Sequence, residues 1–229
     1  MAQSDESAKH DKRVEALIRA AREAIPYTGS ASALYEGIIR PQLTRRGYEF
    51  LQGLLDRLLG IEGAYPAFDL EATLANPDFA AFVTDATHVA ARTRNAEKME
   101  ALRNAVLNVA VGTTIDEDLQ EIFLRAVENL TPSHLRMLRF AQDPAGAATA
   151  LGVETTPSPP LYEQALSIVF PEFRQRPDVY RQLYEDLVTR GFILSSSNLG
   201  VSQGRSIKRT TELGEQFLAF IADPQEGAT

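Results

Sequence analysis

The stretch from Val179 to Ile221 constrains the fold of this chain more than any other part of the sequence. It begins with an amphipathic segment that ends at Gly191 and continues as a short apolar run, Phe-Ile-Leu. A Ser-, Gly- and Asn-rich tip separates that run from a second short run at residues 205–210. The apolar positions after it have helical spacing: Leu213, Phe217 and Ile221. The pattern predicts a helix that ends at a left-handed glycine, a β-hairpin and a final helix.

This order of elements resembles the C-terminal half of winged-helix domains. Residues 131–142 would supply the first helix of such a domain, so the resemblance covers about 90 residues. Thr210 or Thr211 is expected to cap the final helix, because a threonine oxygen can accept a bond from a free N–H in the first turn. Gly214, in that first turn, would let the helix approach its neighbour closely.

The rest of the chain predicts a mainly α fold with one β-hairpin. Apolar residues at helical spacing predict helices over these ranges: 12–25, 31–60 with Pro41 as a kink or a new start, 77–89, 95–111, 116–130, 132–142 and 161–170. Residues 60–69 and 144–160 are predicted loops, the second with one helical turn near Ala147. We expect a multi-helix region over 1–130 with a frayed start at 1–12, a winged-helix-like domain over 131–222 and an acidic tail over 223–229.

Several helix starts carry local signals. Asn76 and Thr131 are predicted N-caps, and each is followed by a proline at the first helical position. The acidic run Asp116–Asp118 suits the positive end of the helix that follows. The inner face of that helix is predicted to contain Leu119, Ile122, Phe123, Ala126, Val127 and Leu130.

Composition narrows the location and the class of partner. Apolar residues make up 44% and charged residues 24% of the 229 residues, which is ordinary for a soluble globular protein. The apolar runs are too short for a membrane span and the N-terminus lacks a signal-peptide core, so we expect a cytoplasmic protein with no membrane contact. The absence of cysteine excludes disulfides and Cys-ligated zinc.

Charge disfavours a nucleic-acid partner. The net charge is −8. Residues 1–130 hold 14 Lys and Arg against 20 Asp and Glu, and residues 131–221 hold nine of each. A protein that mainly binds nucleic acid usually has a basic domain or a basic face, and neither part of this sequence is basic.

The candidate contact residues for a partner or for nucleic acid lie in the winged-helix-like segment: Arg181, Gln182, Arg205, Lys208 and Arg209. In DNA-binding winged helices the helix before the hairpin enters the major groove and the wing touches phosphates. Here that helix also carries Glu185 and Asp186, which would repel phosphates. The three basic wing residues are either phosphate contacts or solvated charges that protect a strand edge.

No motif predicts a catalytic residue, a cofactor site or a metal site. The histidines His10, His88 and His134 are scattered, and Asp85 with His88 forms a pair where a metal site needs three or four ligands. His134 is placed to pack or cap a helix rather than to catalyse. The run Ser195–Ser197 lacks the context of a nucleophile elbow, and no glycine-rich phosphate loop follows a strand.

Two stretches carry a further resemblance. Residues 33–47, Ala-Leu-Tyr-Glu-Gly-Ile-Ile-Arg-Pro-Gln-Leu-Thr-Arg-Arg-Gly, resemble an early helix of the abortive-infection alpha family of bacterial proteins. Residues 210–217 resemble the Leu-Thr-x-x-Gly-x-x-Phe-like helix with which that family tends to end, although this chain has Thr-Thr-Glu at its start. Residues 94–108 and 130–140 are similar to uncharacterised bacterial proteins of like layout. The resemblance implies a bacterial protein associated with phage defence and carries over no catalytic residue.

These observations favour a non-enzymatic protein that acts by docking to another protein or to itself. The alternative is a transcription regulator that binds DNA through the winged helix. A third class, an enzyme without a recognisable motif, would need carboxylates or histidines from distant positions to converge.

Overall fold

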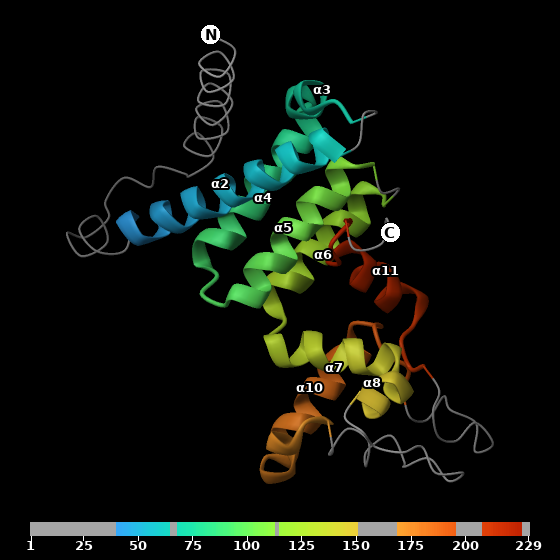
Figure 1. Ribbon diagram of the computed structural model, residues 1–229. Helices are drawn as coiled ribbons and strands as arrows, with labels where there is room; N and C mark the ends of the chain where they lie inside the picture. The colour runs from blue at the N-terminus through green and yellow to red at the C-terminus, as the bar shows by residue number, and fades with distance from the viewer. Residues whose placement is uncertain (1–39, 65–67, 113–114, 151–168, 196–207, 226–229) are drawn as a thin grey trace. The chain divides into compact units, whose positions relative to one another are not determined.

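The computed structural model describes residues 40–64, 68–112, 115–150, 169–195 and 208–225, and its helices are shown in Figure 1. The chain divides into two compact units. Unit 1 comprises Met1–Asn129 and Ile221–Thr229, and unit 2 comprises Leu130–Phe220. The last nine residues therefore belong to the first unit and not to the one that precedes them in the chain.

Unit 1 is helical throughout its described part. Its helices are α2 (Arg40–Ala64), α3 (Leu70–Ala75), α4 (Pro77–Arg92), α5 (Ala96–Ala110) and α6 (Glu117–Asn129). Figure 1 shows α4 and α5 beside α2, with α6 packed on α5. Its core is formed by leucines of α2 together with aromatic and aliphatic side chains of the other helices, including Phe50, Leu54, Leu58, Leu102, Val106 and Phe123. Apolar burial of this kind supplies most of the stability of a helical bundle.

Local signals set the helix starts, as predicted. Asn76 accepts bonds from the backbone N–H groups of Asp78 and Phe79, with Pro77 in the first turn. Asp116 accepts from the N–H of Leu119 at the start of α6. These caps satisfy donors that have no partner within the helix.

Two expectations for unit 1 are wrong. The helix predicted to end at Gly60 continues to Ala64, because one solvent-facing glycine does not outweigh the packing of the leucines around it. Ile122, predicted to lie inside, is 48% exposed, and Leu124 is buried in its place. Residues 60–64 of the loop predicted over 60–69 thus belong to α2, residues 65–67 lie outside the described residues, and α3 begins at Leu70.

Unit 2 contains α7 (Pro132–Gln142), α8 (Pro144–Ala150), the 3-10 helix η2 (Pro171–Gln175), α10 (Pro177–Thr189) and α11 (Glu212–Phe220). Helices α10 and α11 both pack on α7. Thr131 caps α7 in a capping box with His134, so the expected capping role of this histidine is confirmed. The helical turn expected near Ala147 is part of α8.

The β-hairpin predicted between α10 and α11 is not supported. Among the described residues the only β-pairing is one isolated antiparallel bridge, between Ile193 and Thr210. Two backbone bonds flank it, from Leu194 N–H to the Arg209 carbonyl at 2.9 Å and from Thr211 N–H to the Phe192 carbonyl at 3.0 Å. The fold shown for this part of the chain is mainly α, and the expected hairpin tip lies in 196–207, outside the described residues.

Two glycines shape the connection from α10 to α11. Gly191 has a φ of +74°, the left-handed conformation that the sequence predicted for a residue after a helix end. A Cβ on Gly214 would overlap the carbonyl oxygen of Phe192, so α11 approaches that backbone as closely as expected. Thr211 is the residue that caps α11, since its Oγ1 accepts from Gly214 N–H at 3.0 Å. The rings of Phe192 and Phe217 stack with centroids 4.8 Å apart.

In the described part of the chain, no helix combines the length and apolar character needed to cross a membrane. The predicted helix over 12–25 lies outside the described residues, as does all but the end of the one over 161–170.

Candidate functional site

The two candidate contact residues on α10, Arg181 and Gln182, are exposed. Each lies beside an aspartate of the same helix. Gln182 Nε2 donates to the Oδ1 atom of Asp186 at 2.7 Å. Arg181 Nη1 lies 4.0 Å from the Oδ1 atom of Asp178. Because Glu185 is exposed on the same helix, this surface presents acids and an amide together with its one arginine.

The described wing residues are also engaged. Lys208 forms an ion pair with Glu215 of α11. Arg209 donates its backbone N–H to the carbonyl of Ala141 at 2.7 Å. Arg205 lies outside the described residues. Of the three described cations among these candidates, two lie beside an acid: Lys208 beside Glu215 and Arg181 beside Asp178.

The possible metal pair on α4 gains no further ligand. Asp85 is exposed, and the buried Nε2 atom of His88 has no hydrogen-bond partner in the described structure. No group of three or more His, Asp or Glu side chains that could hold a metal ion occurs among the described residues.

His134 is 5% exposed and joins α7 to α10. Its Nδ1 atom accepts from the Thr131 N–H at 3.0 Å, so the proton of the neutral ring lies on Nε2. Nε2 lies 3.3 Å from the Oδ2 atom of Asp186 and donates to it. Nδ1 therefore serves the cap of α7, and Nε2 links α7 to α10.

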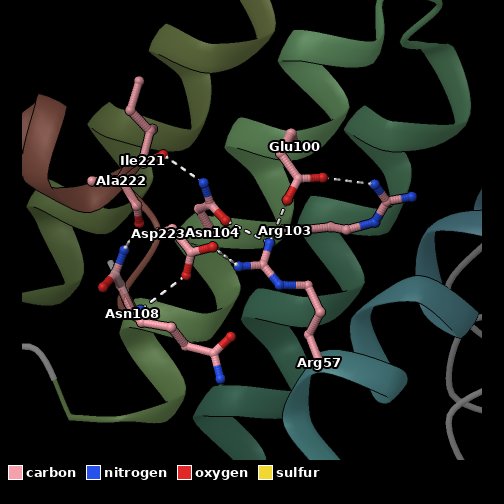
Figure 2. Close-up of polar contacts among 9 residues, drawn as sticks. Arg57, Glu100, Arg103, Asn104, Asn108, Ile221, Ala222 and Asp223 are labelled. Atoms are coloured by element: carbon pink, nitrogen blue, oxygen red, sulfur yellow. Dashed lines mark hydrogen bonds and ion pairs between the residues drawn. The ribbon is translucent and has the colours of Figure 1, made fainter. Parts of the chain in front are cut away.

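The most strongly organised polar site lies in unit 1, where α2 and α5 meet the segment that follows α11. Arg57 projects from α2 amid buried leucines and is 19% exposed. Glu100, Asn104 and Asn108 lie at intervals of four residues on α5, so they share one face of that helix. Figure 2 shows Arg57, Asn104 and Asn108 directed toward residues 221–223, while Glu100 points to Arg57 and Arg103.

Arg57 is the centre of this site. It pairs with Glu100, and its Nη1 atom donates to the Oδ1 atom of Asn104 at 2.7 Å. Its Nη2 atom forms an ion pair with the Oδ2 atom of Asp223 at 2.7 Å. Arg103 pairs with the second oxygen of Glu100 at 3.1 Å, which fixes that carboxylate from the other side. Two arginines and two acids therefore balance in charge.

Two buried amides bind the backbone of the terminal segment. Asn104 Nδ2 donates to the carbonyl of Ile221 at 3.0 Å, and Asn108 Nδ2 donates to the carbonyl of Ala222 at 2.8 Å. The side chain of Ile221 is 1% exposed. Asp223 is ordered by its own turn, in which its Oδ1 atom accepts from the Gln225 N–H at 2.9 Å.

This geometry is suited to recognising a peptide. Two donors one helical turn apart bind two consecutive carbonyls, an arginine binds the following acid, and an aliphatic side chain is enclosed beside them. We refer to Arg57, Glu100, Asn104 and Asn108 as the segment site. The ion pair between Arg57 and Asp223 adds a charge preference to these two neutral hydrogen bonds.

Sequence reasoning missed the segment site, although two signals pointed to it. One is an arginine within the leucine-rich run of α2. The other is a pair of asparagines, four residues apart, in the C-terminal half of α5, which is apolar apart from them. Buried amides and cations need partners, so these residues predict a polar contact without naming the segment that makes it.

Comparison of the chain with protein families, with curated proteins and with solved structures finds no match. The resemblance to the abortive-infection alpha family and its association with phage defence stay predictions from the sequence.

Proposed function

We propose that this protein is a non-catalytic docking protein and that the segment site is its docking surface. The observation that supports this most directly is the pair of bonds from Asn104 and Asn108 to two consecutive backbone carbonyls. Backbone carbonyls occur in every peptide, so these bonds provide affinity for a chain segment of many sequences. Arg57 and the enclosure of Ile221 add a preference for an aliphatic residue and for an acid two positions after it.

The arrangement also indicates why the side chains of this site would bind rather than react. Arg57 and Arg103 are balanced by Glu100 and Asp223, and the two asparagine amides are donors that do not transfer protons. Such groups position a ligand, and nothing in their arrangement activates a nucleophile.

For unit 2 we propose a winged-helix-like role in protein contact, with α7, α10 and α11 as its helices. The DNA-binding alternative has less support, because Lys208 is paired with Glu215 and the exposed face of α10 is not basic. A titration with duplex DNA at low salt separates the two. We expect no binding, and a salt-dependent shift that Lys208→Ala and Arg209→Ala reduce would favour the regulator instead.

The docking proposal is tested with two variants that break the same ion pair from opposite sides. Asp223→Ala removes the acid of the chain's own segment and leaves the segment site unchanged. Arg57→Ala removes the cation of the segment site itself. We expect partners captured from a native bacterial lysate to increase with Asp223→Ala and to be lost with Arg57→Ala. Equal capture by both variants, measured on folded protein, would show that the segment site is not a docking surface.

A further inference from the structure

The segment site is filled by a part of the chain that changes unit. Helix α11 belongs to unit 2 up to Phe220, and the residues from Ile221 onward belong to unit 1. The bond from Asn104 to Ile221 joins residues 117 positions apart. A short terminal segment bound at such sequence distance is the kind of element that protein copies can exchange.

We propose that the segment site also takes residues 221–223 of a second copy of this chain, so that the protein self-associates by exchanging its C-terminal segment. This inference rests on the proposed docking function and names its partner. A second copy offers the same two carbonyls, the same aliphatic side chain and the same carboxylate. Every contact that the segment makes within one chain can therefore form between two chains.

The side chains of the segment site also contact one another, independently of the segment that they bind. Arg57 is held by Glu100 and by the Oδ1 atom of Asn104, and Glu100 is held in turn by Arg103. None of these contacts involves the segment, so each can persist when the segment leaves. A site prepared in this way can accept the same segment from either source.

An empty site is unfavourable, which favours exchange over simple release. Asn104 and Asn108 are 8% and 7% exposed, so their amides would lose acceptors in a place with little access to water. Arg57 would lose its pairing with Asp223. At high protein concentration, a segment from a second copy can relieve these losses as well as the chain's own segment does.

The chain has no cysteine, so the exchange can be tested with single thiols. A full chain carrying Asn108→Cys is activated as a mixed disulfide with thionitrobenzoate. It is then mixed at high concentration with a reduced full chain carrying Ala222→Cys, at a position that is exposed. The thiolate displaces thionitrobenzoate only where the segment of one copy lies in the site of the other. We expect a covalent dimer on a denaturing gel, with the helical circular dichroism of both chains unchanged.

A reduced chain carrying Glu121→Cys, on the exposed face of α6, is the matched control. It should yield roughly tenfold less dimer, because its thiol has no raised effective concentration near the site. A double variant with both Asn108→Cys and Ala222→Cys reports docking within one chain. If only this variant links, and only internally, exchange is wrong while the segment site remains a docking surface. If it does not link either, the docking proposal fails too.

Discussion

The amide of Asn108 shows how much one buried donor matters for the terminal segment. Its Nδ2 atom donates to the carbonyl of Ala222, and the side chain has little access to water. Asn108→Asp would replace the donor by a carboxylate oxygen that faces a carbonyl oxygen. We expect the free energy of unfolding to fall by at least about 1–3 kcal/mol, the usual cost of a buried neutral polar group without a partner, because a buried charge costs more. Urea denaturation followed by circular dichroism measures the change.

The control for this substitution lies on the neighbouring helix. Asn129 is exposed and donates its Nδ2 atom to the Arg125 carbonyl. Asn129→Asp makes the same chemical change where water can replace the lost bond, so the loss should stay below about 0.5 kcal/mol. Equal losses at both positions would mean that the terminal segment is not held by Asn108.

Lys98 should make the stability of unit 1 depend on pH in the alkaline range. Burial lowers its pKa below the ordinary value of 10.5, and Glu128 raises it by a smaller amount. The unfolded chain therefore takes up this proton at a higher pH than the folded chain does. Stability should rise as the pH increases from the lowered pKa to about 10.5, because protonation favours the unfolded state throughout that range.

Lys98→Met should remove this rise, which denaturation at a series of alkaline pH values will show. The substitution also removes the bond from Nζ to the Glu128 carbonyl, so only the pH-dependent part of the difference tests the idea. Lys208→Met removes an exposed lysine and serves as the comparison. A rise that persists unchanged in Lys98→Met would assign it to other groups.

At the scale of single residues, the sequence identifies local roles and not distant partners. The caps at Asn76 and Thr131 are readable because the atoms that they bind lie within three residues of them. Arg57 and Asn104 stand out only as polar residues among apolar ones. Their partners lie more than 40 positions away, on another helix or in the segment at 221–223, and no local pattern connects them.

At the scale of elements, Gly214 sets how closely α11 can approach the connection after α10. Any Cβ at this position would meet the carbonyl of Phe192, and backbone atoms cannot move aside as a flexible side chain can. Gly214→Ala should destabilise the protein by about 1–3 kcal/mol or more, although alanine is the better helix former. Thermal denaturation will measure it.

Gly60 of α2 provides the control, because its replacement by alanine should stabilise the protein rather than destabilise it. A Cβ there would meet no atom within 4 Å. Gly60→Ala should therefore raise the free energy of unfolding by about 0.5–1 kcal/mol, the gain expected for alanine inside a helix. A stabilising effect at Gly214 as well would contradict the close approach.

The sequence could predict those elements whose signals are local. Helices with strong apolar spacing and a cap were predicted, because both signals are local. The end of α2 was misplaced, and Ile122 was put on the wrong side, because neighbouring helices decide these points. The hairpin prediction relied on short apolar runs, which also occur in chain that forms a single bridge, as at Ile193 and Thr210.

At the scale of the whole molecule, two connections pass between the units, after Asn129 and after Phe220. The second leads into the segment site. Unit 1 is therefore completed by residues that follow unit 2 in the sequence, and we expect the stability of its α2 and α5 helices to depend on them. Periodicity could not reveal this dependence, since it concerns residues more than a hundred positions apart.

Removing residues 221–229 tests that dependence directly. The truncated chain loses the burial of Ile221 and the bonds to Asn104, Asn108 and Arg57, which together should cost unit 1 at least about 3 kcal/mol. Hydrogen exchange should then show faster exchange of amides in α2 and α5, while those of α7 and α10 in unit 2 change little. A chain that ends after Gln225 keeps all of these contacts and should exchange like the full chain. If both truncations behave alike, the terminal segment does not stabilise unit 1, and the segment site loses its structural basis.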